Sequence, residues 1–209
     1  MPTSIEIIPG VRHFPGYFDR STQEALLGEL RDTLRRAPPF TPRMPRTDKP
    51  FSVRMSNCGI LGWVSDANGY RYQPTHPETS APWPPMPALL SRTWQDIAAG
   101  APPPEACLIN IYDSRAKMGL HQDRDERELS APVVSLSLGD TAIFRVGGLT
   151  RGAATRSFRL QSGDAVVLGG PARLAFHGVD RIIAGSSTLL AEGGRINLTL
   201  RRVTLSGAE

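Results

Sequence analysis

The second half of this 209-residue chain is a succession of short β-rich segments separated by turn residues. Each segment is long enough for one strand, and Gly, Pro, Asp and Ser are common between them. This spacing is typical of an all-β sandwich or barrel. The segments are residues 106–112, 132–138, 141–146, 156–160, 164–168, 173–176 and 195–203.

The first half predicts helices and a few strands. Residues 5–8 and 11–14 read as two short strands around a Pro-Gly turn. Residues 21–24 (STQE) have the pattern of a capping box, and leucines at helical spacing follow it. This helix is expected to end before the two prolines at 38–39, because the residue before a proline avoids the helical conformation.

Further along, residues 51–58 alternate as a strand does, and residues 59–72 have the character of a hairpin with Asn68-Gly69 as its turn. A second helix is expected from Pro87 to Ala99. We therefore predict a mostly β protein with flanking helices, in which a jelly roll is supported by two helices.

Composition excludes several classes of protein. No apolar run reaches the roughly 18 residues that a membrane-spanning helix needs, so no membrane partner is expected. Two cysteines do not make a disulfide framework, which favours reduced thiols and a cytoplasmic location. The formal net charge is only +4, but residues 35–54 contain six basic residues, one acidic residue and five prolines. This segment is expected to be a long exposed loop or lid.

Two of the four histidines stand in a pattern that suggests a metal site. His121 and Asp123 are two residues apart, so an extended backbone turns both side chains to one face. His177 follows in the neighbourhood of a predicted strand. Two imidazoles and one carboxylate form the facial triad of non-haem Fe(II) oxygenases. A His-x-Asp sequence in a polar turn without any metal remains the alternative.

The last predicted strand alternates between polar and apolar residues. Its polar face carries Arg195, Asn197, Thr199 and Arg201. If this face points into a barrel, the two buried guanidinium groups need an anionic partner. A dicarboxylate such as 2-oxoglutarate would supply two negative groups. The alternative is the solvated outer face of an edge strand.

A second polar pair has the same spacing. Asn110 and Tyr112 are two residues apart on a predicted strand, so they could offer an amide and a phenol to the same carboxylate. A polar strand face without a ligand is the alternative for this pair.

Five motifs resemble those of the AlkB family of Fe(II)/2-oxoglutarate-dependent nucleic-acid demethylases. They follow one another in the family's order between residues 51 and 201. The motifs are NCGILGW at 57–63, CLINIY at 107–112, HQDRDE at 121–126, GGL at 147–149 and RINLTLR at 195–201. The NxY and RxNxTxR elements make the resemblance specific, because HxD…H alone is shared by many oxygenases.

The resemblance implies a double-stranded β-helix and a set of site residues. Fe(II) would be held by His121, Asp123 and His177, and 2-oxoglutarate by Asn110, Tyr112, Arg195, Asn197 and Arg201. The substrate would be contacted by Trp63, Tyr70, Lys117, Gln122, Asp125, Glu126 and Arg151. Among these, Trp63 and His121 would enclose a flipped base, and Asp125 would face its exocyclic nitrogen. The implied organisation is an N-terminal extension with a nucleotide-recognition lid over 1–85 and a dioxygenase core over 86–209, packed as one unit.

The implied activity is the oxidative demethylation of 1-methyladenine and 3-methylcytosine in DNA. O2 would be consumed, 2-oxoglutarate would become succinate and CO2, and formaldehyde would be released. The expected partner is alkylated DNA, single-stranded by preference, with double-stranded DNA and RNA as further candidates, and the protein is expected to be a monomer. A related oxygenase acting on tRNA or protein is the alternative enzyme, and a jelly-roll binding module with an inactive metal site is the non-enzymatic alternative.

Overall fold

The computed structural model describes residues 3–98 and 100–205 and contains two antiparallel sheets that face each other. The major sheet has the strand order β1-β2-β11-β8-β13-β6-β3. Its strands are β1 (Ile5–Ile8), β2 (Val11–Phe14), β3 (Arg54–Gly59), β6 (Ala106–Tyr112), β8 (Val133–Gly139), β11 (Ala165–Leu168) and β13 (Arg195–Arg201).

The minor sheet has the order β10-β9-β12-β7, and a separate hairpin joins β4 to β5. Its strands are β7 (Met118–His121), β9 (Thr141–Val146), β10 (Arg156–Leu160) and β12 (His177–Ile183), and the hairpin pairs β4 (Gly62–Asp66) with β5 (Gly69–Gln73). One apolar cluster contains residues of both sheets, among them Phe144, Val146 and Leu168. Every strand pair in the two sheets is antiparallel. From β6 to β13 the chain passes back and forth between the two sheets, with β9 and β10 as a hairpin within the minor sheet, so the fold is the predicted jelly roll.

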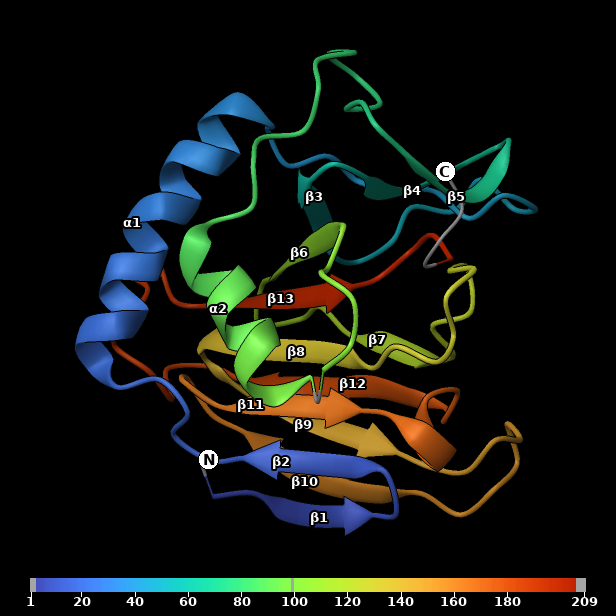
Figure 1. The fold of residues 1–209 in the computed structure, drawn as a ribbon. Helices are drawn as coiled ribbons and strands as arrows, with labels where there is room; N and C mark the ends of the chain where they lie inside the picture. The colour runs from blue at the N-terminus through green and yellow to red at the C-terminus, as the bar shows by residue number, and fades with distance from the viewer. Residues whose placement is uncertain (1–2, 99, 206–209) are drawn as a thin grey trace.

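Two helices flank the major sheet (Figure 1). Helix α1 spans Arg20–Arg36 and α2 spans Ala88–Ile97. Their apolar residues pack in a second cluster with the outward-facing residues of β8 and β13, such as Leu136 and Leu198. The alternation of β13 is therefore used on both sides, since its apolar face holds the helices and its polar face turns toward the space between the sheets.

Several predicted boundaries are corrected by the structure. The N-cap of α1 is Asp19, whose carboxylate accepts a hydrogen bond from the backbone N–H of Thr22 at 2.8 Å, so the capping box at 21–24 was wrong. Helix α1 ends at Arg36, before the two prolines, as predicted. Helix α2 ends at Ile97, and Ala99 lies outside the described residues.

Two further corrections concern the β segments. The hairpin turn consists of residues 67–68, one position earlier than predicted, because Asp66 pairs with Gly69. The predicted strand at 173–176 was wrong: a 3-10 turn (Gly170–Ala172) precedes this segment, and strand β12 begins only at His177. The short strand β7, which ends at His121, was not predicted.

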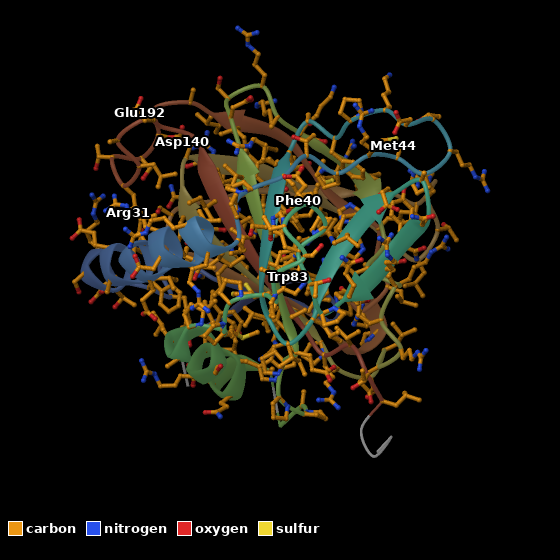
Figure 2. The ribbon with its side chains drawn as sticks, turned by 90° about the horizontal axis from the view of Figure 1, so that it is seen from above. Arg31, Phe40, Met44, Trp83, Asp140 and Glu192 are labelled. Carbon is orange, nitrogen blue, oxygen red and sulfur yellow. The ribbon has the colours of Figure 1, made fainter. Side chains whose placement is uncertain are left out.

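The N-terminal part of the chain contributes strands to the major sheet and also forms the loop at 37–53 and the β4–β5 hairpin. Strands β1, β2 and β3 extend the major sheet, so the two predicted parts of the chain share one sheet, and a boundary at residue 85 stays a prediction. Residues 37–53 form the loop that was expected over 35–54, because residues 35–36 still belong to α1 and the strand expected over 51–58 is β3, which begins only at Arg54. This loop is linked to β4 by hydrogen bonds between Arg43 and Ser65. In Figure 2, Met44 lies on this outer loop, whereas Phe40 and Trp83 lie farther inside, and their rings are 6.4 Å apart.

Among the described residues, no helix has both the length and the apolar character needed to cross a membrane. Cys58 and Cys107 are both buried and free, and they lie directly opposite each other on β3 and β6. The hydrogen bond with the neighbouring Cys58 thiol and burial raise the pKa of Cys107, which disfavours its reactive thiolate form.

The corrected cap of α1 can be tested by two single substitutions. Asp19→Ala should lower the thermal midpoint of unfolding by about 2–4 °C, because it removes the acceptor for the Thr22 amide. Ser21→Ala is the matched control and should leave the midpoint within about 1 °C of the unsubstituted protein, because Ser21 only donates to Asp19. A larger fall in the midpoint for Ser21→Ala than for Asp19→Ala would show that Ser21 caps the helix, as the capping box predicts.

Candidate active site

The space between the two sheets contains a cavity of about 720 Å³. His121, Asp123 and His177 all line it, and their ligand atoms lie within 4.8 Å of one another. His121 ends β7 and His177 begins the adjacent strand β12, where the two residues are directly opposite each other. Strand pairing therefore brings together two histidines that are far apart in the sequence, and Asp123 follows immediately after β7.

Both histidines are held with one ring nitrogen free. Nδ1 of His121 lies 2.9 Å from the carbonyl oxygen of Gly119, and Nδ1 of His177 lies 2.9 Å from that of Ala175. Since a carbonyl oxygen can only accept, each Nδ1 carries the proton and each Nε2 keeps its lone pair. The two Nε2 atoms are 3.6 and 3.8 Å from the carboxylate oxygens of Asp123. Backbone carbonyls that orient ligating imidazoles in this way are a common second layer of metal sites.

The carboxylate of Asp123 is held from the opposite side by Arg201. Nη2 and Nε of Arg201 donate to Oδ2 of Asp123 at 2.8 and 3.2 Å, which leaves Oδ1 directed toward His121. Burial alone would raise the pKa of Asp123, but Arg201 and the two histidines outweigh it and hold this pKa well below its usual range. Asp123 is therefore a carboxylate, as a metal ligand requires.

Burial also disfavours the charged form of His177, and for a histidine this lowers the pKa. The pKa of His177 is lowered to about 4, first because the ring is buried and second because His121 is close. His177 is consequently neutral at physiological pH. The three side chains offer two imidazoles and one carboxylate, which is the donor set that non-haem Fe(II) prefers.

At another wall of the cavity lies Arg195, which contacts no acidic side chain among the described residues. Its Nη2 donates to Oγ of Ser137 at 2.8 Å, and its Nη1 donates to the carbonyl oxygens of Asp140 and Leu160, each at 3.3 Å. Its Nε has no hydrogen-bond partner among the described residues, although the side chain is almost completely buried. Burial lowers the pKa of Arg195 to about 10, so the group remains charged at neutral pH. A buried cation with an unused donor fits an anionic ligand.

The other residues predicted for 2-oxoglutarate surround Arg195 and Arg201. Asn110, Tyr112 and Asn197 are buried and line the same cavity. Oδ1 of Asn110 has no partner among the described residues, and burial raises the pKa of Tyr112 to about 12, which keeps its hydroxyl protonated as a donor. The polar face of β13 is thus buried and turned into the cavity rather than being a solvated edge.

Trp63 is positioned by the residues that precede it in the NCGILGW motif. The side chain of Asn57 accepts from the backbone N–H of Trp63 and donates to its carbonyl oxygen, both at 3.0 Å. At Gly62 a Cβ atom would lie only 2.4 Å from the ring of Trp83, so only glycine lets the two segments approach. The motif therefore fixes the start of β4 and directs the indole of Trp63 toward the cavity.

An aromatic and acidic group of residues lies at the cavity mouth. The rings of Trp63 and Tyr70 are stacked with centroids 5.7 Å apart, and Tyr70 is half exposed. Nε1 of Trp63 donates to the carboxylate of Asp125 at 2.8 Å. From the loop at 37–53, Met44 and Phe51 also line this mouth, with the ring of Phe51 6.2 Å from that of Trp63.

Three other predicted substrate contacts lie at or near the mouth. Gln122 donates to the carbonyl oxygen of Leu174 at 2.6 Å, and Arg151 donates to that of Leu120 at 2.9 Å and lies over the ring of Phe176. Both line the cavity. Lys117 is exposed just before β7 and is absent from the cavity lining. The roles of these three residues stay predictions.

Glu126 differs from the other predicted substrate contacts. Its side chain is buried, and its carboxylate is shared among Arg173, Arg201 and the hydroxyl of Tyr72 at 3.2, 3.2 and 2.5 Å. Both oxygens of this carboxylate are thus engaged by protein side chains, and a direct contact of Glu126 with substrate stays a prediction. Leu168 is buried and lines the cavity.

Sequence reasoning missed Tyr72 and Arg173. Tyr72 lies directly opposite Trp63 in the β4–β5 hairpin, and Arg201 donates to its hydroxyl at 3.3 Å. Arg173 donates to the backbone carbonyls of Asp123 and Ala131 and thereby anchors the segment that carries Asp123. The spacing of Tyr70 and Tyr72 on one strand face could have indicated the first. Nothing local marked Arg173, because its partners lie some 40 to 50 residues earlier.

The comparisons agree with this geometry. The profile of the 2OG-Fe(II) oxygenase superfamily matches residues 10–201. The chain is 53% identical over 198 residues to an alpha-ketoglutarate-dependent dioxygenase AlkB homolog from Caulobacter vibrioides, covering 95% of this chain and 90% of that protein. It is 42% identical over 189 residues to the alpha-ketoglutarate-dependent dioxygenase AlkB of Escherichia coli, covering 88% and 87%. The solved structure of OsALKBH1 superposes with a TM-score of 0.83 at 31% identity and covers 96% of this chain and 100% of that one.

The cavity, the triad and the two buried arginines define a 2-oxoglutarate- and Fe(II)-dependent dioxygenase. Within that superfamily, the chain belongs to the AlkB family. Its cofactor and cosubstrates are accordingly Fe(II), 2-oxoglutarate and O2. The residues present fit these groups, since the three ligand atoms converge and Arg195 has an unused buried donor.

The low pKa of His177 predicts a pH dependence of the metal-free protein. Between about pH 6.5 and pH 4 the unfolded chain binds a proton at this histidine that the folded chain does not bind, so the free energy of unfolding falls as the pH falls. The loss approaches about 3 kcal/mol at pH 4, because the pKa of this histidine is about 6.5 in the unfolded chain and about 4 in the folded chain.

Urea unfolding in the presence of a chelator at pH 7 and pH 4.5 would measure this effect, with His177→Gln as the comparison. The variant should lose less stability across this interval than the unsubstituted protein. Equal losses in the two proteins would show that His177 is not protected from protonation by burial.

Proposed function

We propose that this dioxygenase demethylates N-alkylated bases, 1-methyladenine and 3-methylcytosine, in DNA and thereby repairs alkylation damage. The observation that carries the proposal is that an aromatic pair and a carboxylate, Trp63 with Tyr70 and Asp125, lie at the mouth of the cavity that contains the triad. The printed names of the relatives support it, since they include AlkB dioxygenases, a DNA N(6)-methyladenine demethylase from Arabidopsis thaliana and a nucleic acid dioxygenase from Mus musculus.

The residues at the mouth favour a damaged base on electrostatic grounds. Both methylated bases carry a positive charge, whereas the unmodified bases are neutral. The face of an indole and a nearby carboxylate attract a cation, so Trp63 and Asp125 select the alkylated form. A methyl group on the pairing edge also weakens base pairing, which lowers the cost of flipping the base out of the helix.

Inside the cavity, different side chains would bind the metal and the cosubstrate. His121, Asp123 and His177 would hold Fe(II), and Arg195, with Tyr112 and Asn110, would hold a carboxylate of 2-oxoglutarate. Arg201 orients Asp123 through two hydrogen bonds and, with Asn197, would complete the cosubstrate pocket. When bound, Fe(II) activates O2, so that one oxygen atom oxidises the N-methyl carbon, released as formaldehyde, and the other enters succinate as 2-oxoglutarate loses CO2.

The proposal extends to the lid and to the form of the nucleic acid. Residues 1–85 would be the extension that carries a nucleotide-recognition lid, because the exposed Arg46 and Lys49 lie on the same loop as Met44 and Phe51 at the cavity mouth. The backbone around the flipped base would be contacted by Tyr70, Gln122, Lys117 and Arg151. Glu126 would be a further substrate contact. We propose single-stranded DNA as the preferred substrate, with double-stranded DNA and RNA as further substrates, and a cytoplasmic monomer as the acting form.

The experiment that tests the proposal measures formaldehyde release from 3-methylcytosine in single-stranded DNA, double-stranded DNA and RNA, with and without 2-oxoglutarate. The unsubstituted protein should release formaldehyde only with 2-oxoglutarate, and fastest from single-stranded DNA. His121→Ala should reduce release to the level of a reaction without protein, because one of three metal ligands is lost. His121 is half-buried, so its removal leaves no unpaired buried charge and the variant should melt like the parent.

Two results would contradict the proposal. Full formaldehyde release by a folded His121→Ala variant would remove His121 from the metal site. Succinate formation without demethylation of any of the three nucleic acids would retain the dioxygenase and exclude these substrates, leaving the tRNA- or protein-directed alternative.

A further inference from the structure

A second basic segment lies outside the lid. Residues 141–160 contain four arginines and no acidic residue. They comprise β9, β10 and the connection between them. Arg151 in this connection lines the mouth of the cavity, but the three other arginines have no role in the site described above. The position of each in the minor sheet shows what it can contact.

The register of the minor sheet places Arg145, Arg159 and Arg181 on its outer face. Arg159 and Arg181 both pair with Ile143, from β10 and β12 on either side of β9. Arg145 is two residues further along β9, so it shares the face of Ile143. The residues that alternate with them along β9, Phe144 and Val146, belong to the buried cluster between the sheets and show which face is inside.

These three arginines form what we call the outer basic face. Arg159 and Arg181 are exposed, and neither has an ion-pair or hydrogen-bond partner within residues 3–98 and 100–205. Their backbones are two strand spacings apart, or about 10 Å. Arg145 pairs with Asp180 at 3.2 Å, and its Nε is buried and unpartnered among the described residues. Arg156 is excluded, because it lies on the opposite side of its strand and donates to the carbonyl oxygen of Ile7.

The outer basic face is continuous with the mouth of the active site. Strand β9 ends at Val146, which pairs with the metal-site residue His177 at the start of β12. Counting back along β9 from Val146, the first residue on the outer face is Arg145. The next one is Ile143, and Arg159 and Arg181 lie on either side of it. Figure 1 shows β10, β9 and β12 side by side in this sheet. With Arg151 at the mouth, positive charge extends from the cavity along the outside of the minor sheet.

We propose that the outer basic face binds the phosphate backbone of the nucleic-acid strand that continues beyond the flipped base. The proposal rests on the proposed function, since it requires that a polyanion enters the cavity mouth. Guanidinium groups without protein partners are free to bind phosphate in a bidentate manner. Each such contact releases counterions, so the face adds affinity that grows with strand length and weakens with salt. An ordinary solvated sheet face would show neither dependence.

The experiment compares a trinucleotide with a 20-nucleotide single strand, each containing one central 3-methylcytosine. The trinucleotide reaches the cavity but not the row of Arg159 and Arg181, whereas the longer strand can cover both. The test variant is Arg159→Glu with Arg181→Glu. The matched control is Arg31→Glu with Arg92→Glu, which changes the net charge equally at exposed positions on α1 and α2. Figure 2 shows Arg31 on α1, on the opposite side of the molecule from Met44 of the lid.

The test variant should bind the 20-nucleotide strand on the order of tenfold more weakly than the unsubstituted protein in fluorescence anisotropy at 0.1 M salt. The slope of log affinity against log salt should become shallower by about 1.4, for two lost phosphate contacts on a single strand. Formaldehyde release from the trinucleotide should stay within about twofold of the parent, and the control variant should retain most of the affinity for the long strand.

Equal affinity of the test variant and the control for the 20-nucleotide strand would overturn the proposal, and so would an unchanged salt slope. In that case the outer basic face is either only solvated or binds an acidic protein instead. Failure of the proposed function is a different result, because the unsubstituted protein would then release no formaldehyde from either oligonucleotide.

Discussion

The buried ion pair between Asp123 and Arg201 is the interaction on which the rest of the site depends. It joins Asp123, two residues after β7, to the end of β13, across 78 positions of sequence, and both side chains are buried. Breaking such a pair by removing one partner typically costs about 3–5 kcal/mol, because an uncompensated charge is left in the interior. The pair therefore stabilises the fold, and it also fixes one carboxylate oxygen toward His121. Stability and metal-site geometry come from the same contact.

The two arginines of β13 consequently have different electrostatic surroundings. Arg201 is neutralised by Asp123 and Glu126, and these acids together with Tyr72 hold its pKa above the usual value although burial opposes them. Within the part of the chain that the structure describes, Arg195 donates to neutral acceptors only, and burial lowers its pKa. The site thus contains one arginine that is occupied by protein carboxylates and one that still needs an anion. On the outside of the minor sheet, Arg159 and Arg181 also have no protein partner among the described residues, but they are exposed to solvent.

Local pattern predicts the parts of this structure that depend on neighbouring residues. The alternation of residues 195–201 indicated two faces, and both are used, one by the helices and one by the cavity. The spacing of His121 and Asp123 indicated that they lie together, as they do. Long-range pairing was not visible in the same way. The buried partners of Glu126 and the role of Arg173 depend on contacts across 42 to 75 positions. Residues 173–176 were mistaken for a strand because local propensity ignored the turn before them.

The central claim is that Arg201 holds the metal ligand while Arg195 is left to bind the cosubstrate. Calorimetric titration of 2-oxoglutarate into the protein loaded with Mn(II), with Arg195→Gln as the variant, tests it most directly. The account predicts that 2-oxoglutarate affinity falls on the order of 10- to 100-fold, as for a lost charged hydrogen bond, while Mn(II) affinity is unchanged. Unchanged 2-oxoglutarate affinity in this variant would contradict the account.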